Sequence, residues 1–216
     1  MKIADETRRR RTEMFINMPP LKKSLANLYR KNGEITVVVP VYRLLNNFSK
    51  RQEAEVKGYI KRAFWLAYEF SKFGGLLETN TDFYIATHTD LRTQLEPYRQ
   101  LCEFPESQIF QVQDVSMFLG YMPNVHLLHS LCKTTKHKYF IRADTSLYFR
   151  SKHPLLQGVD TYWQKHPTHI IWASLSWNKE SKERLDKAIK NKAGADFEKI
   201  STHLPKYLGF PSMTVF

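Results

Sequence analysis

The sequence lacks a disulfide framework, a long apolar run and an N-terminal signal. Only two of its 216 residues are cysteines, Cys102 and Cys132, which excludes a disulfide-rich scaffold and a cysteine-based metal site. No apolar run approaches the roughly 20 residues that cross a bilayer, and the N-terminus has no apolar signal-peptide core. We therefore expect a cytoplasmic protein without a transmembrane segment, whose length suits a single domain.

Glycine is also scarce where a phosphate-binding loop would need it. The eight glycines form neither a G-x-G-x-x-G fingerprint nor a G-x-x-x-x-G-K-[ST] loop. This disfavours a dinucleotide-dependent dehydrogenase and a P-loop ATPase. A nucleotide, if bound, has to be held by other means.

Acidic residues are outnumbered, and the formal net charge is +12. Residues 1–31 carry nine Lys and Arg against three Asp and Glu, and residues 133–153 carry six against one, which is Asp144. The first block suits either a solvated tail or contact with an acidic surface such as nucleic acid or anionic lipid. The second block suits a basic pocket around Asp144 that takes a ligand with several negative charges.

What the sequence does have is a repeated alternation of strand and helix. Apolar runs predict strands, and helical spacing predicts the segments between them. The strands are expected at 35–41, 81–90, 108–112 and 139–143, and the helices at 50–73, 91–101 and 121–135. This order predicts an α/β fold with a mainly parallel sheet covered by helices on both faces. Pro40 marks the point near the end of the first strand where ladder hydrogen bonds stop.

The two ends of the chain differ from this core. Residues 1–33 are expected to be a basic helical extension, with Leu21, Leu25 and Leu28 at helical spacing, that packs on the domain. Residues 34–150 form the α/β region. Residues 151–216 belong to the same domain, with a strand at 169–177, at an edge or antiparallel, and a charged helix at 178–191. The apolar run at Val215 is either a docked tail or the start of further chain.

A carboxylate follows the fourth strand directly. The strand ends at Ala143, and Asp144-Thr145-Ser146 comes next, as is typical of a buried strand that carries an acid to the edge of a sheet. Together with residues 36–42 and the strand ending in His88-Thr89-Asp90, this pattern resembles the GT-A-fold glycosyltransferases of the family 2-like type, over roughly residues 34–150.

The resemblance implies a fold, a reaction and a set of residues. The activity would be transfer of a sugar from a UDP- or GDP-linked donor to a glycan or another hydroxyl acceptor, assisted by Mn²⁺ or Mg²⁺. Pro40, Val41, Tyr42 and Arg43 would line the nucleoside pocket, and Asp90 would face the base or ribose. Asp144 would be the first acid of the metal-binding DxD motif, whose second acid is replaced here by Ser146.

Further residues follow from the chemistry of such a site. Arg142, with Lys136 and Lys138, can offset the charge of a nucleoside diphosphate. An inverting enzyme needs a carboxylate base, for which Asp160 is preferred over Glu180 and Asp186. Trp172 and Trp177 suit stacking against an acceptor sugar, and Trp163 belongs to the same aromatic group. Each of these aromatic residues also suits ordinary packing.

Three alternatives stay open. A nucleotidyltransferase would normally carry a glycine-rich basic loop after the first strand, which is missing. A basic nucleic-acid-binding module, or a sugar transferase that modifies DNA, fits the charge but not any recognised motif. Loss of the second acid also fits a catalytically inactive glycosyltransferase-like domain. The oligomeric state and the identity of the sugar do not follow from the sequence.

Overall fold

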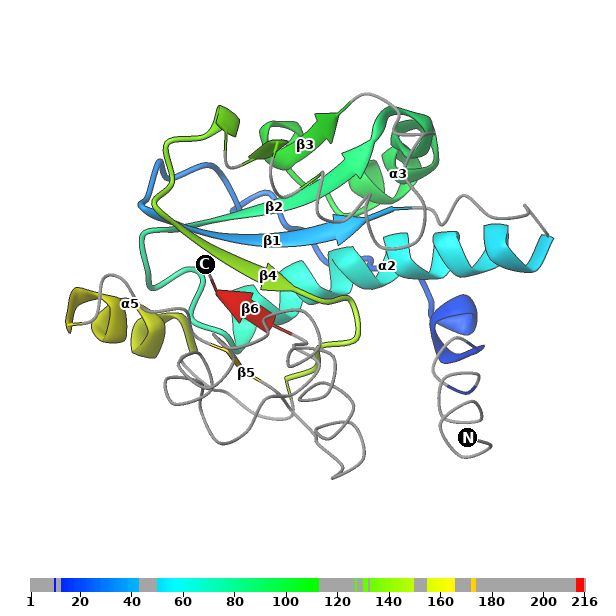
Figure 1. Cartoon of the computed structure of the whole chain (residues 1–216). Coiled ribbons are helices and arrows are strands. Elements are labelled where there is room, and N and C mark those ends of the chain that lie inside the picture. Colours follow the sequence, from blue (N-terminus) through cyan, green and yellow to red (C-terminus); the bar gives the residue numbers. More distant parts are fainter. Residues whose placement is uncertain are drawn as a thin grey trace, which may run out of the picture.

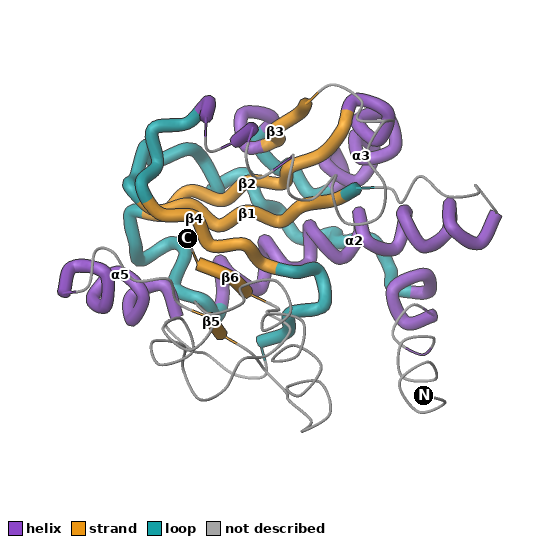
Figure 2. The backbone as a smooth tube through the Cα atoms, viewed as in Figure 1, coloured by secondary structure: helices purple, strands orange, loops and turns teal. Residues whose placement is uncertain are grey.

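The protein is an α/β domain built on a six-stranded sheet of order β3-β2-β1-β4-β6-β5 (Figures 1 and 2). The computed structural model describes residues 10, 13–42, 50–112, 127, 130–131, 133–149, 155–165, 172–173 and 213–215. The strands are β1 (Ile35–Val41), β2 (Thr81–His88), β3 (Ile109–Val112), β4 (Tyr139–Ala143), β5 (Trp172–Ala173) and β6 (Met213–Val215). The helices are α2 (Lys50–Lys72), α3 (Thr89–Leu101) and α5 (Leu155–Lys165), with a short 3-10 turn, η1, at Glu106–Gln108.

The four strands β3, β2, β1 and β4 are parallel, which confirms the α/β prediction at the level of fold class. Strand β1 lies in the middle, and both it and β2 are buried along their whole length. A strand buried on both faces has no reason to alternate apolar with polar residues, which explains the continuous run at Ile35–Val41. The predicted bounds of β1 and β4 are confirmed to the residue.

Helical segments cover the two faces of the sheet. On one face, odd-numbered residues of β1 pack with α2 and α3, through side chains such as Phe64, Phe70 and Leu95. On the other face, Val38, Tyr84 and Phe140 pack with Leu127 and Leu131, which lie in the predicted helix at 121–135. The doubly covered sheet expected from the sequence is therefore present in the described part of the chain.

The N-terminal segment departs from the prediction. Residues 13–17 are helical, but residues 18–31 are not, so the helix expected through Leu21, Leu25 and Leu28 is wrong. These three leucines are nevertheless buried in the main core. The segment follows α2, where Lys61 Nζ donates hydrogen bonds to the Ile16 and Met18 carbonyls and Trp65 Nε1 donates to the Pro19 carbonyl. Side-chain donors on α2 thus replace the internal hydrogen bonds of a helix.

The second half of the sheet was only partly anticipated. The short strand β5 lies at the sheet edge and runs antiparallel to β6, in agreement with the expected edge or antiparallel strand. Strand β6 enters between β4 and β5 and pairs antiparallel with β4, as its position beside β4 in Figure 1 shows. Helix α5 was not predicted, and the predicted helix at 178–191 lies outside the described residues.

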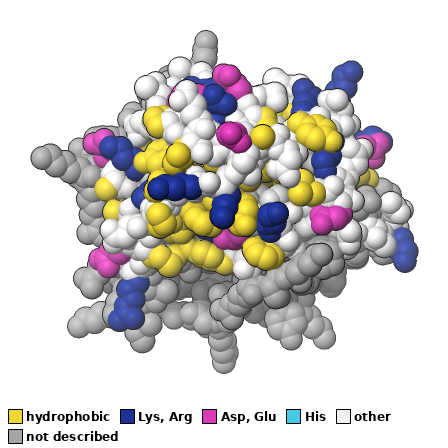
Figure 3. All heavy atoms as spheres, turned by 180° about the vertical axis from the view of Figure 1, so that it is seen from behind, with side chains coloured by type: hydrophobic (Ala, Val, Ile, Leu, Met, Phe, Trp, Pro, Cys, Tyr) yellow, Lys and Arg dark blue, Asp and Glu magenta, His cyan; other side chains and the backbone are white. Residues whose placement is uncertain are grey.

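The surface behind the sheet carries mixed side chains. Figure 3, the view from behind, shows hydrophobic side chains gathered near the middle of this face with Lys, Arg and acidic residues scattered among them. On the described part of this face the charges therefore do not form a stripe of one sign, the usual electrostatic footprint of a nucleic-acid-binding surface. None of the described helices is long and apolar enough to cross a membrane.

Candidate functional site

The order of the parallel strands identifies one place where a ligand is expected. The chain runs outward from β1 to β2 and β3, and then returns to place β4 on the opposite side of β1. In open α/β sheets, ligands bind outside the carboxyl ends of the strands where the direction of winding reverses. In this sheet the reversal falls between β1, which ends at Val41, and β4, which ends at Ala143.

Pro40 shapes this edge. The β1–β2 pairing continues to Val41 and Thr87, whereas the β1–β4 pairing ends at Val38 and Arg142. Proline has no N–H to donate to a ladder. The prediction that laddering stops near Pro40 is confirmed on the β4 side and is wrong on the β2 side, where Pro40 and Val41 are still paired with Ala86 and Thr87. Beyond Val38, the strands that flank the reversal point are no longer joined to each other.

Asp144 begins a tight turn directly after β4. Its Oδ1 accepts a hydrogen bond from the Ser146 amide at 2.8 Å, and its main-chain carbonyl accepts one from the Leu147 amide at 3.0 Å. Its Oδ2 lies 3.4 Å from Nη2 of Arg142. The Asp144 side chain is 37% exposed, whereas that of Arg142 is 16% exposed. The carboxylate is held in place by the turn and still reaches solvent.

Arg142 lies on the same face of the sheet as Tyr42. Residues in register on neighbouring strands point to the same side, and Arg142 is in register with Val38. Val38 and Tyr42 both belong to the core cluster on that face. His88, at the end of β2, is buried there too, in register with Val112 of β3. The structure therefore brings Pro40, Tyr42, Arg142 and Asp144 to one edge. Val41 ends β1 at the same edge, but its side chain is buried in the core on the opposite face, away from Tyr42.

Within its described part, the structure does not bring the remaining predicted site residues to the Asp144 turn. Asp90 lies in the first turn of α3, which begins at Thr89, one residue after β2 ends. A negative charge is generally favoured at that end of a helix. Its side chain lies outside the described part. Arg43 and Trp177 also lie outside the described residues.

Asp160 and Trp172 have described backbones only. Asp160 lies in α5, and the start of α5 contacts the Gly74 carbonyl through the Leu156 amide, just beyond the end of α2. Figure 1 shows α5 at the end of the sheet where the parallel strands begin, away from the carboxyl end of β4, which Asp144 follows. Trp172 is in register with Thr214, which is in register with Arg142. Its backbone thus lies two strands, about 10 Å, from Arg142.

The basic block around Asp144 is divided by β4. Lys136 and Lys138 precede the strand, and Asp144 follows it, so Lys138 lies about 20 Å from Asp144 along the strand. Lys138 Nζ instead pairs with Glu34 at 2.6 Å. The expectation that these two lysines assist at Asp144 is therefore wrong. Among the described Lys and Arg side chains, that of Arg142 contacts the Asp144 carboxylate.

The opposite, amino edge of the sheet holds a buried polar group that the sequence did not reveal. Asp82, at the start of β2, contacts His137 Nε2 through Oδ2 at 2.6 Å, and its Oδ1 accepts a hydrogen bond from the Lys31 amide. Burial alone would raise the pKa of the Asp82 carboxyl, but the hydrogen bonds from His137 and Lys31 outweigh it and lower the pKa. Lys31 Nζ donates to the Leu76 and Thr79 carbonyls. This group joins the N-terminal segment, β2 and the start of β4.

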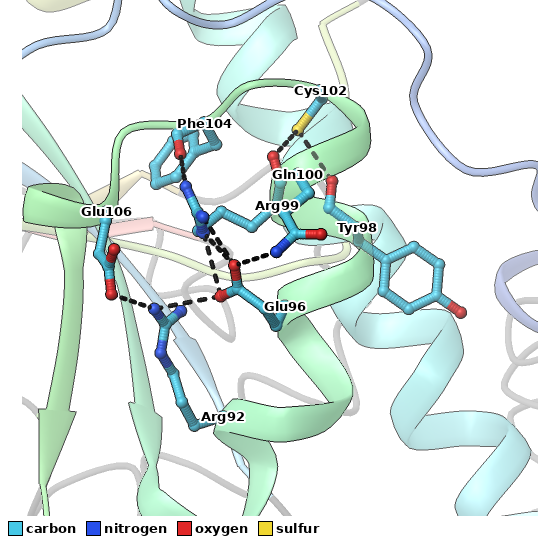
Figure 4. Close-up of polar contacts among 8 residues, drawn as sticks. All are labelled: Arg92, Glu96, Tyr98, Arg99, Gln100, Cys102, Phe104 and Glu106. Carbon is cyan, nitrogen blue, oxygen red and sulfur yellow. Dashed lines mark hydrogen bonds and ion pairs between the residues drawn. The ribbon is translucent and has the colours of Figure 1, made fainter.

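A second polar network lies at the end of α3 (Figure 4). Arg99 binds Glu96 through Nη2 at 2.6 Å and donates from Nη1 to the Phe104 carbonyl at 3.0 Å. Arg92 pairs with both Glu96 and Glu106. Cys102 is buried beside this network, and burial raises the pKa of its thiol to about 11. A thiol that stays protonated near neutral pH is a poor nucleophile, so Cys102 is a packing residue.

Metal-binding capacity within the described part is limited. No three side chains of His, Cys, Asp or Glu gather there into a group that could hold a metal ion. A site at Asp144 would therefore have to draw most of its ligands from the bound molecule and from water. Comparison of the chain with protein-family models, with characterised proteins and with solved structures gives no significant match.

Proposed function

We propose that the protein is a glycosyltransferase that uses a UDP- or GDP-linked sugar and a divalent cation, with the donor bound between the carboxyl ends of β1 and β4. One observation carries the proposal. The winding of the sheet reverses between β1 and β4, and a held but solvent-reaching carboxylate, Asp144, stands at that reversal. The resemblance of residues 34–150 to the GT-A enzymes supports the same assignment.

The residues at this edge are compatible with a metal–diphosphate complex. A carboxylate has about four acceptor positions, and Asp144 uses its two oxygens for one amide and one long contact with Arg142. Mg²⁺ commonly binds through one or two carboxylates together with substrate phosphates and water. Asp144, with the Ser146 hydroxyl as a further oxygen donor, would supply the protein's share. When bound, the ion would stabilise the nucleoside diphosphate as a leaving group.

Other side chains have definite tasks in this proposal. Arg142 presents a guanidinium, which can bind phosphate oxygens in a bidentate manner, next to Asp144. Tyr42 directly follows β1 and offers a ring to the nucleoside. Trp172, two strands from Arg142, stands on the side where a glycan acceptor would bind. Asp160 is not retained as the base, because its helix starts at the amino edge.

The test measures the binding of nucleoside diphosphates, by thermal unfolding and by calorimetry. UDP or GDP with Mn²⁺ should stabilise the wild-type protein, by about 2.7 kcal/mol at a ligand concentration 100 times the dissociation constant. The substitution Asp144→Asn should weaken the Mn²⁺-dependent binding by roughly 100-fold, since it removes the ligand itself, and loss of an outer-shell partner already costs roughly 10–100-fold.

The asparagine is chosen to keep the fold. Its side-chain oxygen still accepts the hydrogen bond from the Ser146 amide, so the turn is preserved and the charge is lost. Glu34→Gln is the matched control, because it neutralises an exposed carboxylate at the opposite edge of the sheet. If neither UDP nor GDP binds with Mn²⁺, the proposal fails. If Asp144→Asn binds as wild type does, the metal assignment fails.

A further inference from the structure

Arg62, in the middle of α2, is a completely buried cation. Its side chain is 0% exposed, and its two terminal nitrogens bind the two carboxylate oxygens of Glu69, each at 2.9 Å. Glu69 lies two helical turns further along α2 and is 15% exposed. The neighbouring buried positions of this helix are apolar, including Ile60, Phe64 and Phe70.

Stability alone does not explain such a pair. Removing two charges from water costs about as much as their attraction returns, so apolar residues of the same volume often serve equally well or better. A buried guanidinium differs from an apolar side chain in that it fixes particular hydrogen-bond acceptors in space. The question is which acceptors Arg62 holds.

Arg62 and Glu69 hold the segment that follows the Asp144 turn. Arg62 Nη2 donates to the Leu147 carbonyl, and the guanidinium lies over the Tyr148 ring, 4.1 Å from its centroid. Glu69 Oε2 accepts a hydrogen bond from the Phe149 amide at 3.4 Å. Three consecutive residues, Leu147 to Phe149, are therefore attached to one ion pair on α2.

The attachment continues to Asp144 itself. The Leu147 amide donates to the Asp144 carbonyl at 3.0 Å, and the Ser146 amide donates to Asp144 Oδ1 at 2.8 Å. An uninterrupted series of contacts thus runs from Arg62 through Leu147 to Asp144. The Arg62 side chain thus contacts the residue whose amide closes the turn that begins at Asp144.

We propose that the Arg62–Glu69 pair is a positioning device for the Asp144–Ser146 turn and thereby sets the affinity of the edge between β1 and β4 for the divalent cation and diphosphate. The inference rests on the proposed function for its ligand. Neither residue touches the ligand. Both act by holding the main chain on the far side of the turn from β4.

The test removes both charges together, in the double variant Arg62→Met/Glu69→Gln, so that no unpaired charge is left buried. The glutamine side chain keeps an acceptor for the Phe149 amide. The matched control is Arg99→Met/Glu96→Gln, because Arg99 likewise pairs with a glutamate on its own helix and holds a carbonyl, that of Phe104, but at the amino edge.

Two measurements follow. Hydrogen exchange by NMR should show faster exchange of the Ser146 and Leu147 amides in the Arg62→Met/Glu69→Gln variant and no change at these amides in the control. Titration of Mn²⁺ in the presence of UDP or GDP should require about 10-fold more Mn²⁺ in the variant, the loss expected for an outer-shell residue. The affinity for uridine or guanosine without metal should stay the same, because β1 is untouched.

The outcomes separate the inference from the function. If wild type binds neither UDP nor GDP with Mn²⁺, the proposed function falls, and the positioning of this ligand falls with it, whatever the exchange rates. If wild type binds and the Arg62→Met/Glu69→Gln variant keeps the wild-type Mn²⁺ requirement, the proposed function stands and the positioning role is overturned. Unchanged exchange at Ser146 and Leu147 overturns it as well, because the turn would then not depend on α2.

Discussion

Asp82 and Asp144 stand at opposite edges of the same sheet and are used in opposite ways. Asp82, at the amino edge, is fully buried, and both of its oxygens are bound by His137 and the Lys31 amide. Asp144, at the carboxyl edge, is more than one third exposed and has one short hydrogen bond and one long contact. The comparison indicates that the amino edge fixes the fold, whereas the carboxyl edge is held from behind and left accessible.

Arg62 on α2 and Arg99 on α3 show the same difference between the carboxyl edge and the amino edge of the sheet. Arg62 and Arg99 each pair with a glutamate and bind a main-chain carbonyl of a following segment. Arg99 ties down the connection between α3 and β3, which belongs to the scaffold. Arg62 ties down the turn that carries Asp144. Substitutions at the two edges should therefore differ in what they change, stability in one case and ligand binding in the other.

Asp82→Ala should have the largest effect on stability. It leaves His137 and the Lys31 amide without their partner in the interior, which costs about 3 kcal/mol for a buried hydrogen-bonded pair. Denaturant unfolding should show a lower midpoint with an unchanged slope. Binding of UDP or GDP with Mn²⁺ should be unaffected in the fraction that stays folded. A clear loss of binding there would contradict the division between the two edges.

Asp82 also predicts how stability depends on pH. The pKa of Asp82 in the folded protein lies below its ordinary value of 3.8. At a pH between the folded pKa and 3.8, the carboxyl is therefore mostly protonated in the unfolded chain and mostly ionised in the folded protein. The unfolded state then binds more protons, and stability falls as the pH falls through this window. Asp82→Asn should flatten the acid side of the stability profile. An unchanged profile would exclude this carboxyl as the cause.

Arg99→Met should have an intermediate effect. Arg99 is 19% exposed, and its loss removes the contacts with Glu96 and with the Phe104 carbonyl. We expect a decrease in unfolding free energy of about 1.5 kcal/mol, the lower end of the range for hydrogen bonds to charged groups, because Arg99 is partly exposed. Hydrogen exchange should accelerate around residues 99–108 and not at Ser146. Acceleration at Ser146 would mean that the two arginines are not independent.

Glu34→Gln should have the smallest effect. Glu34 and Lys138 form an ion pair whose side chains are 63% and 64% exposed, and exposed pairs of this kind contribute little to stability because water screens them. The unfolding midpoint should stay close to wild type, and the small difference should vanish at high salt. A clear loss of stability would show that the start of β4 depends on this pair.

The sequence predicted the parallel part of the fold because that part is recorded in local patterns. Ile35–Val41 is a run of buried strand residues, and α2 carries an apolar stripe through Ile60, Phe64 and Phe70. The leucines at 21, 25 and 28 show the limit of such reasoning. Their spacing is helical, yet Pro19 and Pro20 directly precede them, and the segment is not helical. The Leu25 amide donates instead to the Cys102 carbonyl, just beyond α3.

The site was predictable only where it follows directly from strand ends. Asp144 and Tyr42 come after β4 and β1, so topology alone places them near each other. Nothing in the sequence marked Arg62 beforehand, because the residues that cover the Arg62–Glu69 pair, Leu147 to Phe149, lie about 80 positions further along the chain. Nothing local connects Asp82 with His137, 55 residues apart, because their pairing depends on the finished sheet.

Strand β6 has a consequence for how the protein is made. Residues Met213–Val215 fill the sheet beside β4, about 70 residues after that strand has been synthesised. At roughly 5–20 residues per second, a ribosome takes roughly 4–14 s to produce the missing partner. During this interval the nascent chain presents the open hydrogen-bonding edge of β4, the kind of edge that recruits foreign strands. When β6 pairs with β4, it converts an open edge of the parallel sheet into a paired interior strand.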